Sequence, residues 1–292
     1  MSPQSDLKQR LGKPEILVAP GIYDAFGAMM AERAGFEAFY VSGASIAYTR
    51  LGRPDIGLVS LEEVASVVGT IAERVETPLI VDADTGYGNA INVGRTVRVL
   101  ERAGASAIQL EDQSLPKRCG HLAGKTLVSA GEMCGKIKAA LDARRHGDTL
   151  IVARTDAVGV EGLEPAMERA AKYVEAGADV LFIEALQDDA QLADAVERFG
   201  ADAPLLANMV EGGFTPMHSA DELQALGYSI VIFPGGLVRA LAHAADAYFE
   251  SLAANGSTTP YLDKMLDFGE LNLLLGTQDI LDGAKQYDED QN

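Results

Sequence analysis

The sequence predicts a (β/α)₈ barrel of the TIM type, and three observations indicate it. Eight short apolar runs alternate with segments that carry a helical pattern. Several of those segments end in a glycine just before the next apolar run. The 292 residues also match the usual length of one barrel domain. An open, doubly wound sheet is the alternative that the same elements allow.

The predicted strands are apolar throughout, without polar alternation, as expected for strands of a parallel sheet that helices cover. In chain order they are residues 16–19, 38–41, 79–81, 107–110, 150–153, 180–183, 205–207 and 230–233.

Start and stop signals mark the predicted helices. Capping-box spacing at helix starts is found in the pairs Ser60 with Glu63, Ser129 with Glu132, and Ser219 with Glu222. A glycine suited to a left-handed C-cap follows a helical pattern in the pairs Ala34-Gly35, Ala103-Gly104, Ala176-Gly177 and Leu226-Gly227. This fourfold repeat of helix, glycine and strand supports the barrel.

A C-terminal helical segment is expected beyond the barrel, which we assign to residues 1–254, with residues 255–292 as the additional helices. The second segment contains apolar residues that a closed barrel does not need: Leu262, Met265, Leu266, Phe268, Leu271, Leu273, Leu274 and Leu275. A monomer would expose much of this surface, so we expect these helices to be swapped between subunits of a homo-oligomer, a tetramer or at least a dimer.

Composition and charge exclude several classes of partner. The net charge of −19 argues against nucleic acids and anionic membranes, which clustered Lys and Arg would hold. Residues 1–13 lack the apolar core of an export signal, and no apolar run approaches membrane-spanning length. The two cysteines are too few for a disulfide framework. We therefore expect a cytoplasmic protein whose partner is a small molecule.

Carboxylates follow the third and fourth predicted strands, and the ends of strands are where barrels place their catalytic groups. Asp82 and Asp84 point to the same side of an extended segment, and Glu111 ends the neighbouring strand. An oxygen-only ligand set without a nearby histidine favours Mg²⁺, or Mn²⁺, over Zn²⁺. Asp55 could join as an outer-sphere ligand. The alternative is that these carboxylates only cap the next helices.

Residues 113–128 form a longer connection than the usual βα loop, and we call this segment the lid. It contains the run KRCGH at residues 117–121, where the neighbouring cations favour a thiolate at Cys119 and Gly120 allows close backbone approach. Taken alone, a loop cysteine is more often inert than catalytic, and a lone histidine such as His121 is more often a surface residue. Cys134 lies outside the lid and is expected to be inert.

Arg154 and Asn208 end strands that otherwise point into an apolar barrel. The forked guanidinium suits bidentate capture of a carboxylate, and Glu184 could orient it. The alternative is an Arg–Glu pair that only satisfies the barrel mouth.

Together these motifs resemble the isocitrate lyase/phosphoenolpyruvate mutase superfamily over essentially the whole chain. The matching runs are DADTGYG at 82–88, EDQ at 111–113, KRCGH at 117–121, ARTDA at 153–157 and AN at 207–208. The resemblance implies a Mg²⁺-bound 2-oxo or 2-hydroxy acid beneath a lid that delivers Cys119. The implied binding residues are Tyr40, Ser42, Gly43, Ala44, Asp82 and Arg154.

The implied reaction is cleavage of a carbon–carbon bond. A base removes the proton of the C2 hydroxyl, the C2–C3 bond breaks to give pyruvate and a carbanion, and Cys119 protonates that carbanion. The base is Tyr40 or an activated water. The leaving carboxylate would be met by Gly120, His121, Arg154 and Asn208.

The branch of the superfamily depends on a few positions. The 2-methylisocitrate lyases tend to have Arg and Thr where this chain has Leu122 and Val210, so polar partners for a third carboxylate are lost. Residues 208–213 look more like the alkylmalate lyases, which makes 2,3-dimethylmalate the expected type of substrate. Oxaloacetate acetylhydrolases usually have Ser in place of Pro234. Phosphonate mutases and hydrolases lack the lid motif, and a catalytically silent homologue is the remaining alternative.

Overall fold

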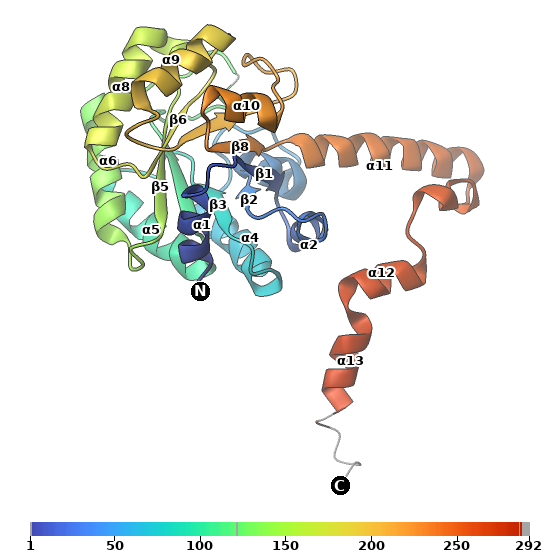
Figure 1. The fold of residues 1–292 in the computed structure, drawn as a ribbon. Helices are drawn as coiled ribbons and strands as arrows, with labels where there is room; N and C mark the ends of the chain where they lie inside the picture. The colour runs from blue at the N-terminus through green and yellow to red at the C-terminus, as the bar shows by residue number, and fades with distance from the viewer. Residues whose placement is uncertain (1, 121, 286, 288–292) are drawn as a thin grey trace. The chain divides into compact units, whose positions relative to one another are not determined.

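In the described residues, eight parallel strands close into a barrel in chain order, with β1 hydrogen-bonded to β8 (Figure 1). This structure is a computed structural model that describes residues 2–120, 122–285 and 287. The strands are β1 (Leu17–Ile22), β2 (Phe39–Val41), β3 (Leu79–Asp82), β4 (Ala107–Glu111), β5 (Leu150–Thr155), β6 (Val180–Ile183), β7 (Leu205–Asn208) and β8 (Ile230–Phe233). The predicted barrel is confirmed, because an open sheet would not pair its first strand with its last.

Helices surround this barrel (Figure 1). They are α1 (Pro3–Leu11), α2 (Ala25–Arg33), α3 (Gly43–Ile46), the π-helical turn η1 (Ala47–Leu51), α4 (Leu61–Arg74), α5 (Ala90–Ala103), α6 (Ala130–Ala143), α7 (Val158–Glu161), α8 (Leu163–Glu175), α9 (Asp189–Phe199) and α10 (Ala220–Leu226). Helix α1 was not expected. Its Leu7 is 1% exposed and packs with the residues that fill the barrel, including Leu17 and Phe182.

Several strands continue past their apolar runs into the polar residues that follow. β3 ends at Asp82, β4 at Glu111 and β7 at Asn208. Glu111 lies opposite Arg154 in the register of β4 with β5. Strand pairing therefore extends to the mouth of the barrel, where it fixes the backbone positions of these polar residues.

The predicted helix caps are confirmed with one difference. Ser60 and Ser219 form complete capping boxes, whereas the Ser129 side chain accepts from the Glu132 N–H. The predicted C-cap glycines all have positive φ: Gly35 at 87°, Gly104 at 116°, Gly177 at 100° and Gly227 at 109°.

The chain separates into two compact units, Met1–Val238 and Arg239–Asn292. The boundary falls within α11 (Gly236–Asn255), which is followed by the 3₁₀ turn η2 (Thr259–Lys264), α12 (Phe268–Leu275) and α13 (Thr277–Lys285). In the described residues, α12 and α13 bury no side chain, and Phe268 is 88% exposed. The division after residue 254 and the swapped oligomer stay predictions.

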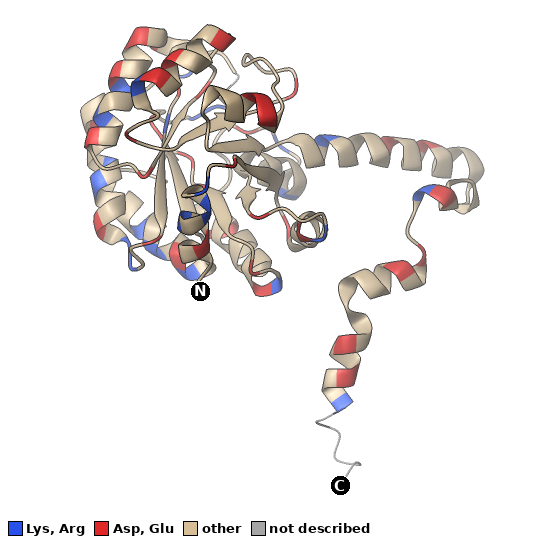
Figure 2. Ribbon diagram, viewed as in Figure 1, with Lys and Arg blue, Asp and Glu red and all other residues tan. Residues whose placement is uncertain are grey.

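Acidic residues lie along the helices of both units, with basic residues interspersed (Figure 2). None of the helices in the described part of the chain has the length and apolar character that a membrane crossing requires. The cytoplasmic location stays a prediction.

Candidate active site

A cavity of about 50 Å³ lies at the carboxyl ends of the strands, beneath the lid. Its lining residues are Tyr40, Ser42, Ala44, Asp55, Asp82, Glu111, Lys117, Arg118, Cys119, Gly120, Arg154, Glu184, Asn208, Val210 and Pro234. Most of the predicted site residues are thus brought together. Gly43 adjoins them, since a Cβ on it would lie 3.1 Å from Asp82 Oδ2. His121 lies outside the described residues.

The four predicted metal-binding carboxylates are buried around this cavity, but a lysine occupies the space between two of them. The ammonium nitrogen of Lys117 lies 2.6 Å from Oδ1 of both Asp55 and Asp84. In the described part of the chain, no three Asp, Glu, His or Cys side chains form a ready-made metal shell. The direct convergence of three carboxylates expected from the sequence is therefore not seen. Sequence reasoning treated Lys117 only as a neighbour of the thiol.

The chemistry of these groups nevertheless fits a hard divalent cation. Oε1 of Glu111 is buried without a hydrogen-bond partner. Burial raises the pKa of Glu111 well above its usual value, and burial raises that of Asp84 to about 7 against the opposing effect of Lys117. Burial disfavours the ionised form of a carboxyl group, and a bound cation would offset that cost. Mg²⁺ keeps several water ligands, so such a cation needs only one or two direct carboxylate ligands.

The turn after β3 sets the positions of Asp82, which lines the cavity, and Asp84, which lies in the turn and not on the extended segment that the sequence predicted. Asp84 has a φ of 48°, a left-handed conformation that few residues other than glycine adopt. Its N–H donates to Asp82 Oδ1 at 3.1 Å. Gly86 must be glycine, because a Cβ there would lie 2.4 Å from Val93. The left-handed backbone of Asp84 is strained, and strain of this kind concentrates at functional sites, where the surrounding structure maintains it.

Arg154 is fixed at the cavity by three carboxylates, those of Asp156, Glu184 and Glu111, the last at 3.5 Å from its Nε. Its guanidinium donates to Asp156 through Nε at 2.9 Å and Nη2 at 3.0 Å. Glu184 lies 3.2 Å from Nη2, and Asn208 donates to the same Glu184 oxygen at 2.9 Å. The expected contact of Glu184 with Arg154 is thus present. The sequence analysis gave Asp156 no role, although its place directly after the end of β5 and two residues after Arg154 was a usable signal.

Tyr40 is a hydrogen-bond donor in this site. Its hydroxyl donates to Gln109 Oε1 at 3.0 Å, and Gln109 Nε2 donates to Asp82 Oδ1 at 3.3 Å. Burial, followed by the charge of Asp82, raises the pKa of Tyr40 well above its usual value. The phenol therefore stays protonated at neutral pH, which argues against Tyr40 as an ionised base.

The lid lies against the barrel mouth. The Gln113 side chain pairs with both backbone groups of Arg118, at 2.8 and 2.9 Å, and the Cys119 N–H donates to Asp55 O at 3.2 Å. A Cβ on Gly120 would lie 2.3 Å from Arg154 Nη2, so only glycine fits there. These contacts place Cys119 at the edge of the cavity.

Two positions used to judge the branch differ in their placement. Val210 lines the cavity, as its proposed effect on specificity requires. Leu122 is 46% exposed and is absent from the lining residues. Of these two residues, Val210 alone is placed to affect binding of a third carboxylate.

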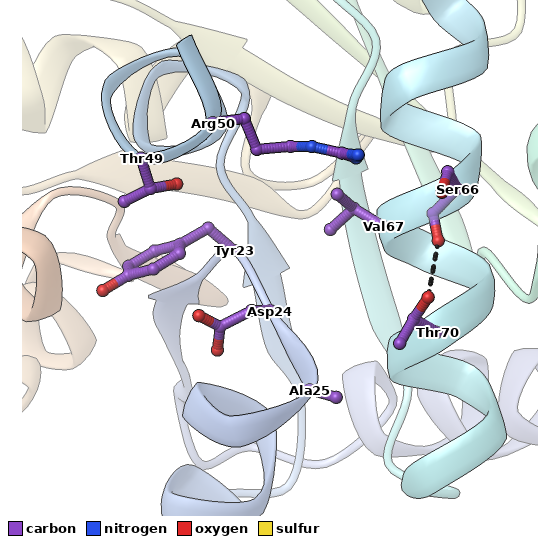
Figure 3. Close-up of a pocket in the computed structure, with 8 residues that line it drawn as sticks. All are labelled: Tyr23, Asp24, Ala25, Thr49, Arg50, Ser66, Val67 and Thr70. Carbon is purple, nitrogen blue, oxygen red and sulfur yellow. Dashed lines mark hydrogen bonds between the residues drawn. The ribbon is translucent and has the colours of Figure 1, made fainter. Parts of the chain in front are cut away.

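A larger cavity of about 340 Å³ lies between the start of α2, the turn η1 and helix α4 (Figure 3). Its lining residues are Tyr23, Asp24, Ala25, Thr49, Arg50, Ser66, Val67 and Thr70. Several of their polar groups serve the local backbone: Asp24 accepts from Gly27 N at 2.7 Å, and Thr70 donates to Ser66 O at 2.9 Å. We therefore assign the chemistry to the cavity beneath the lid.

A closed barrel with carboxylates, an arginine and a lid cysteine at its mouth defines a barrel enzyme of organic-acid chemistry. A family model described as phosphoenolpyruvate phosphomutase matches residues 7–253, and the chain belongs to this family. The chain is 50% identical over 273 residues to a 2-methylisocitrate lyase of Aeropyrum pernix, covering 94% of this chain and 87% of the relative. It is 42% identical over 289 residues to a 2,3-dimethylmalate lyase of Eubacterium barkeri, covering 98% and 99%.

Solved structures agree with this assignment. A crystal structure of 2,3-dimethylmalate lyase, described as a PEP mutase/isocitrate lyase superfamily member, matches with a TM-score of 0.92 and 36% identity, covering 98% of this chain and 96% of the other. A phosphonopyruvate hydrolase in complex with oxalate and Mg²⁺ matches with a TM-score of 0.89 and 29% identity, covering 98% and 99%. The predicted superfamily is thus confirmed.

Proposed function

We propose that this protein is a Mg²⁺-dependent carbon–carbon lyase that cleaves an alkylmalate-type 2-hydroxy dicarboxylate, such as 2,3-dimethylmalate, to pyruvate and a short carboxylate. One observation carries the proposal: a lid cysteine lines the same cavity as the acidic residues and the arginine. The lyase names of the relatives from Aeropyrum pernix and Eubacterium barkeri support it. The site offers Mg²⁺ the carboxylates of Asp82, Asp84 and Glu111, with Asp55 further out.

We assign each residue a role that its position at the cavity supports. Arg154, held in plane by Asp156 and Glu184, binds a substrate carboxylate. Tyr40 lines the substrate position with its proton donated to Gln109, so we assign removal of the C2 hydroxyl proton to an activated water. When bound, Mg²⁺ supplies Lewis-acid stabilisation of substrate oxygens. Ser42 and Ala44 line the cavity in which the substrate would bind, and Gly43 adjoins Asp82 there.

The thiol completes the reaction. When the C2–C3 bond breaks, its electron pair stays on C3 and the C2 oxygen forms the carbonyl of pyruvate. Cys119 transfers its proton to C3 and is left as a thiolate. Gly120, Arg154 and Asn208 then stabilise the charge of the departing carboxylate, together with His121 by resemblance.

A second candidate is 2-methylisocitrate cleavage to pyruvate and succinate, which the 50% identity to the Aeropyrum pernix lyase favours. The apolar side chain of Val210 in the cavity favours a substrate without a third carboxylate. Oxaloacetate hydrolysis or decarboxylation and phosphonate chemistry rank below both.

A turnover screen with Mg²⁺ tests these assignments, using pyruvate release as the readout where pyruvate is a product. The substrates are 2,3-dimethylmalate, 2-alkylmalates, 2-methylisocitrate, oxaloacetate and phosphonopyruvate. We expect the highest kcat/KM for a 2,3-dialkyl- or 2-alkylmalate. Preference for 2-methylisocitrate would select the second candidate, and turnover of phosphonopyruvate alone would reject the lyase.

We also propose a homotetramer that exchanges its C-terminal helices and works in the cytoplasm. The exposed apolar residues of the second unit, including Phe268 and Leu273, support the exchange.

A further inference from the structure

The lid contains a second buried lysine that the reaction does not use. The side chain of Lys125 is 3% exposed, and its ammonium donates to the backbone carbonyl of Gly120 and to Asp156 Oδ1, the latter at 3.0 Å. A buried ammonium is costly unless it is paired and hydrogen-bonded. Its partners are a lid carbonyl next to Cys119 and a carboxylate of the barrel, so this lysine joins the two.

The carboxylate that Lys125 reaches is the one that holds Arg154. Asp156 accepts from Arg154 Nε and Nη2, and its own N–H donates to the buried Asp112 at 2.9 Å. Gly120 in turn packs on the Arg154 guanidinium. The contacts form a closed ring from Gly120 through Lys125 and Asp156 to Arg154, and back to Gly120.

We infer that Lys125 is a positioning residue that holds the lid down, so that Cys119 stands over the substrate bound by Arg154. The ring of contacts links Lys125 to the position of the lid. The Lys125 ammonium can make both of its hydrogen bonds, to Gly120 and to Asp156, only while Gly120 lies against Arg154. The charges support this. Burial raises the pKa of Asp156, but Arg154 and Lys125 outweigh that effect and lower it to about 2, which keeps the carboxylate ionised.

If Lys125 only stabilised the fold, its loss would not selectively expose the thiol of Cys119. The second cysteine, Cys134, allows a selective exposure of the lid to be distinguished from a general loosening of the fold. Cys119 lies in the lid, whereas Cys134 lies on α6, and both are partly buried. Alkylation by iodoacetamide, followed for each peptide by mass spectrometry, therefore reports lid opening against an internal reference. The inference rests on the proposed function only in that Cys119 is the group delivered, because the labelling needs no turnover.

The test compares Lys125→Met and Lys125→Gln with Lys8→Met in the full-length protein. Lys8 pairs with Asp148 at 3.1 Å on the surface, so it is a matched control for loss of an ion pair. We expect Lys125→Met to raise the Cys119 alkylation rate at least tenfold relative to Cys134, with Lys125→Gln intermediate and Lys8→Met unchanged. With the substrate from the screen, kcat should fall more than KM rises, as expected for a misplaced acid rather than lost binding.

Unchanged Cys119 labelling in Lys125→Met, or an equal rise at both cysteines, would overturn the inference. If Lys125→Met does not fold, the ratio in Lys125→Gln decides: a selective rise at Cys119 supports the positioning role of Lys125, and no such rise rejects it. If the wild type turns over no substrate in the screen, the labelling ratio still decides the role of Lys125, so the two proposals fail separately.

Discussion

The ammonium nitrogen of Lys117 lies 2.6 Å from Oδ1 of Asp84, with both side chains buried. The lysine belongs to the lid and the aspartate to the turn after β3, so this ion pair joins the lid to the acidic residues. Asp55 completes the arrangement at the same distance from the ammonium. The closed position of the lid and the ionisation of Asp55 and Asp84 are therefore linked, because Lys117 of the lid supplies the positive charge beside both carboxylates.

Replacing this lysine should destabilise the metal-free protein. Lys117→Met leaves the carboxylates of Asp84 and Asp55 buried without their cation, which costs on the order of 3 kcal/mol. A divalent cation at these carboxylates should offset part of that loss. We expect a lower Tm for the variant in EDTA and a larger rise in Tm on adding Mg²⁺ than for the wild type, measured by scanning calorimetry. Equal Mg²⁺ effects in both proteins would contradict the link.

The lowered pKa of Asp156 predicts a pH-dependent contribution to stability. Its pKa is lowered from 3.8 to about 2, so its stabilising effect is complete above pH 4 and disappears as the pH falls towards 2. By linkage this contribution is on the order of 2 kcal/mol. Denaturant unfolding should show Asp156→Asn less stable than wild type at pH 6, with the difference shrinking as the pH is lowered from 4. Asp148→Asn, at an exposed pair with Lys8, should show little difference at either pH.

The sequence was sufficient for the barrel because apolar runs and C-cap glycines are local signals. The sequence was also sufficient to predict most of the residues that line the cavity, since the carboxyl ends of parallel strands meet at one edge of the sheet. It did not predict that Lys117 lies between Asp55 and Asp84, or that Lys125 reaches Asp156. Those contacts depend on the path of a long lid, which no local pattern specifies. Helix α1 was missed because its two leucines, Leu7 and Leu11, are too few to show a helical repeat, although both pack against the residues that fill the barrel.

Removal of metal should abolish activity. Excess EDTA should eliminate turnover of the substrate found by the screen, and Mg²⁺ or Mn²⁺ should restore it, because the acidic residues repel an anionic substrate without a cation. Asp82→Ala should behave like the chelated enzyme even with Mg²⁺ present. Full activity after verified metal removal would reject the metal assignment.

The C-terminal helices should be needed for assembly. A chain truncated after Gly256 lacks the exposed apolar residues of α12 and α13, so we expect aggregation or a weakened oligomer. Light scattering of the full-length protein should give a tetramer, or at least a dimer. A monodisperse full-length monomer would contradict the proposed exchange.

Cys119→Ser should separate binding from chemistry. A hydroxyl is a far weaker acid than a thiol, so we expect kcat to fall by about 100-fold or more. Tm and the Kd for pyruvate in the presence of Mg²⁺, measured by calorimetry, should stay near their wild-type values. Cys134→Ser is the matched control and should retain full turnover, since its thiol lies on α6, donates to the Lys172 carbonyl at 3.5 Å and is not among the residues that line the cavity. Wild-type kcat in Cys119→Ser would move the reactions that need no thiol acid, phosphonate chemistry and decarboxylation, ahead of the lyase.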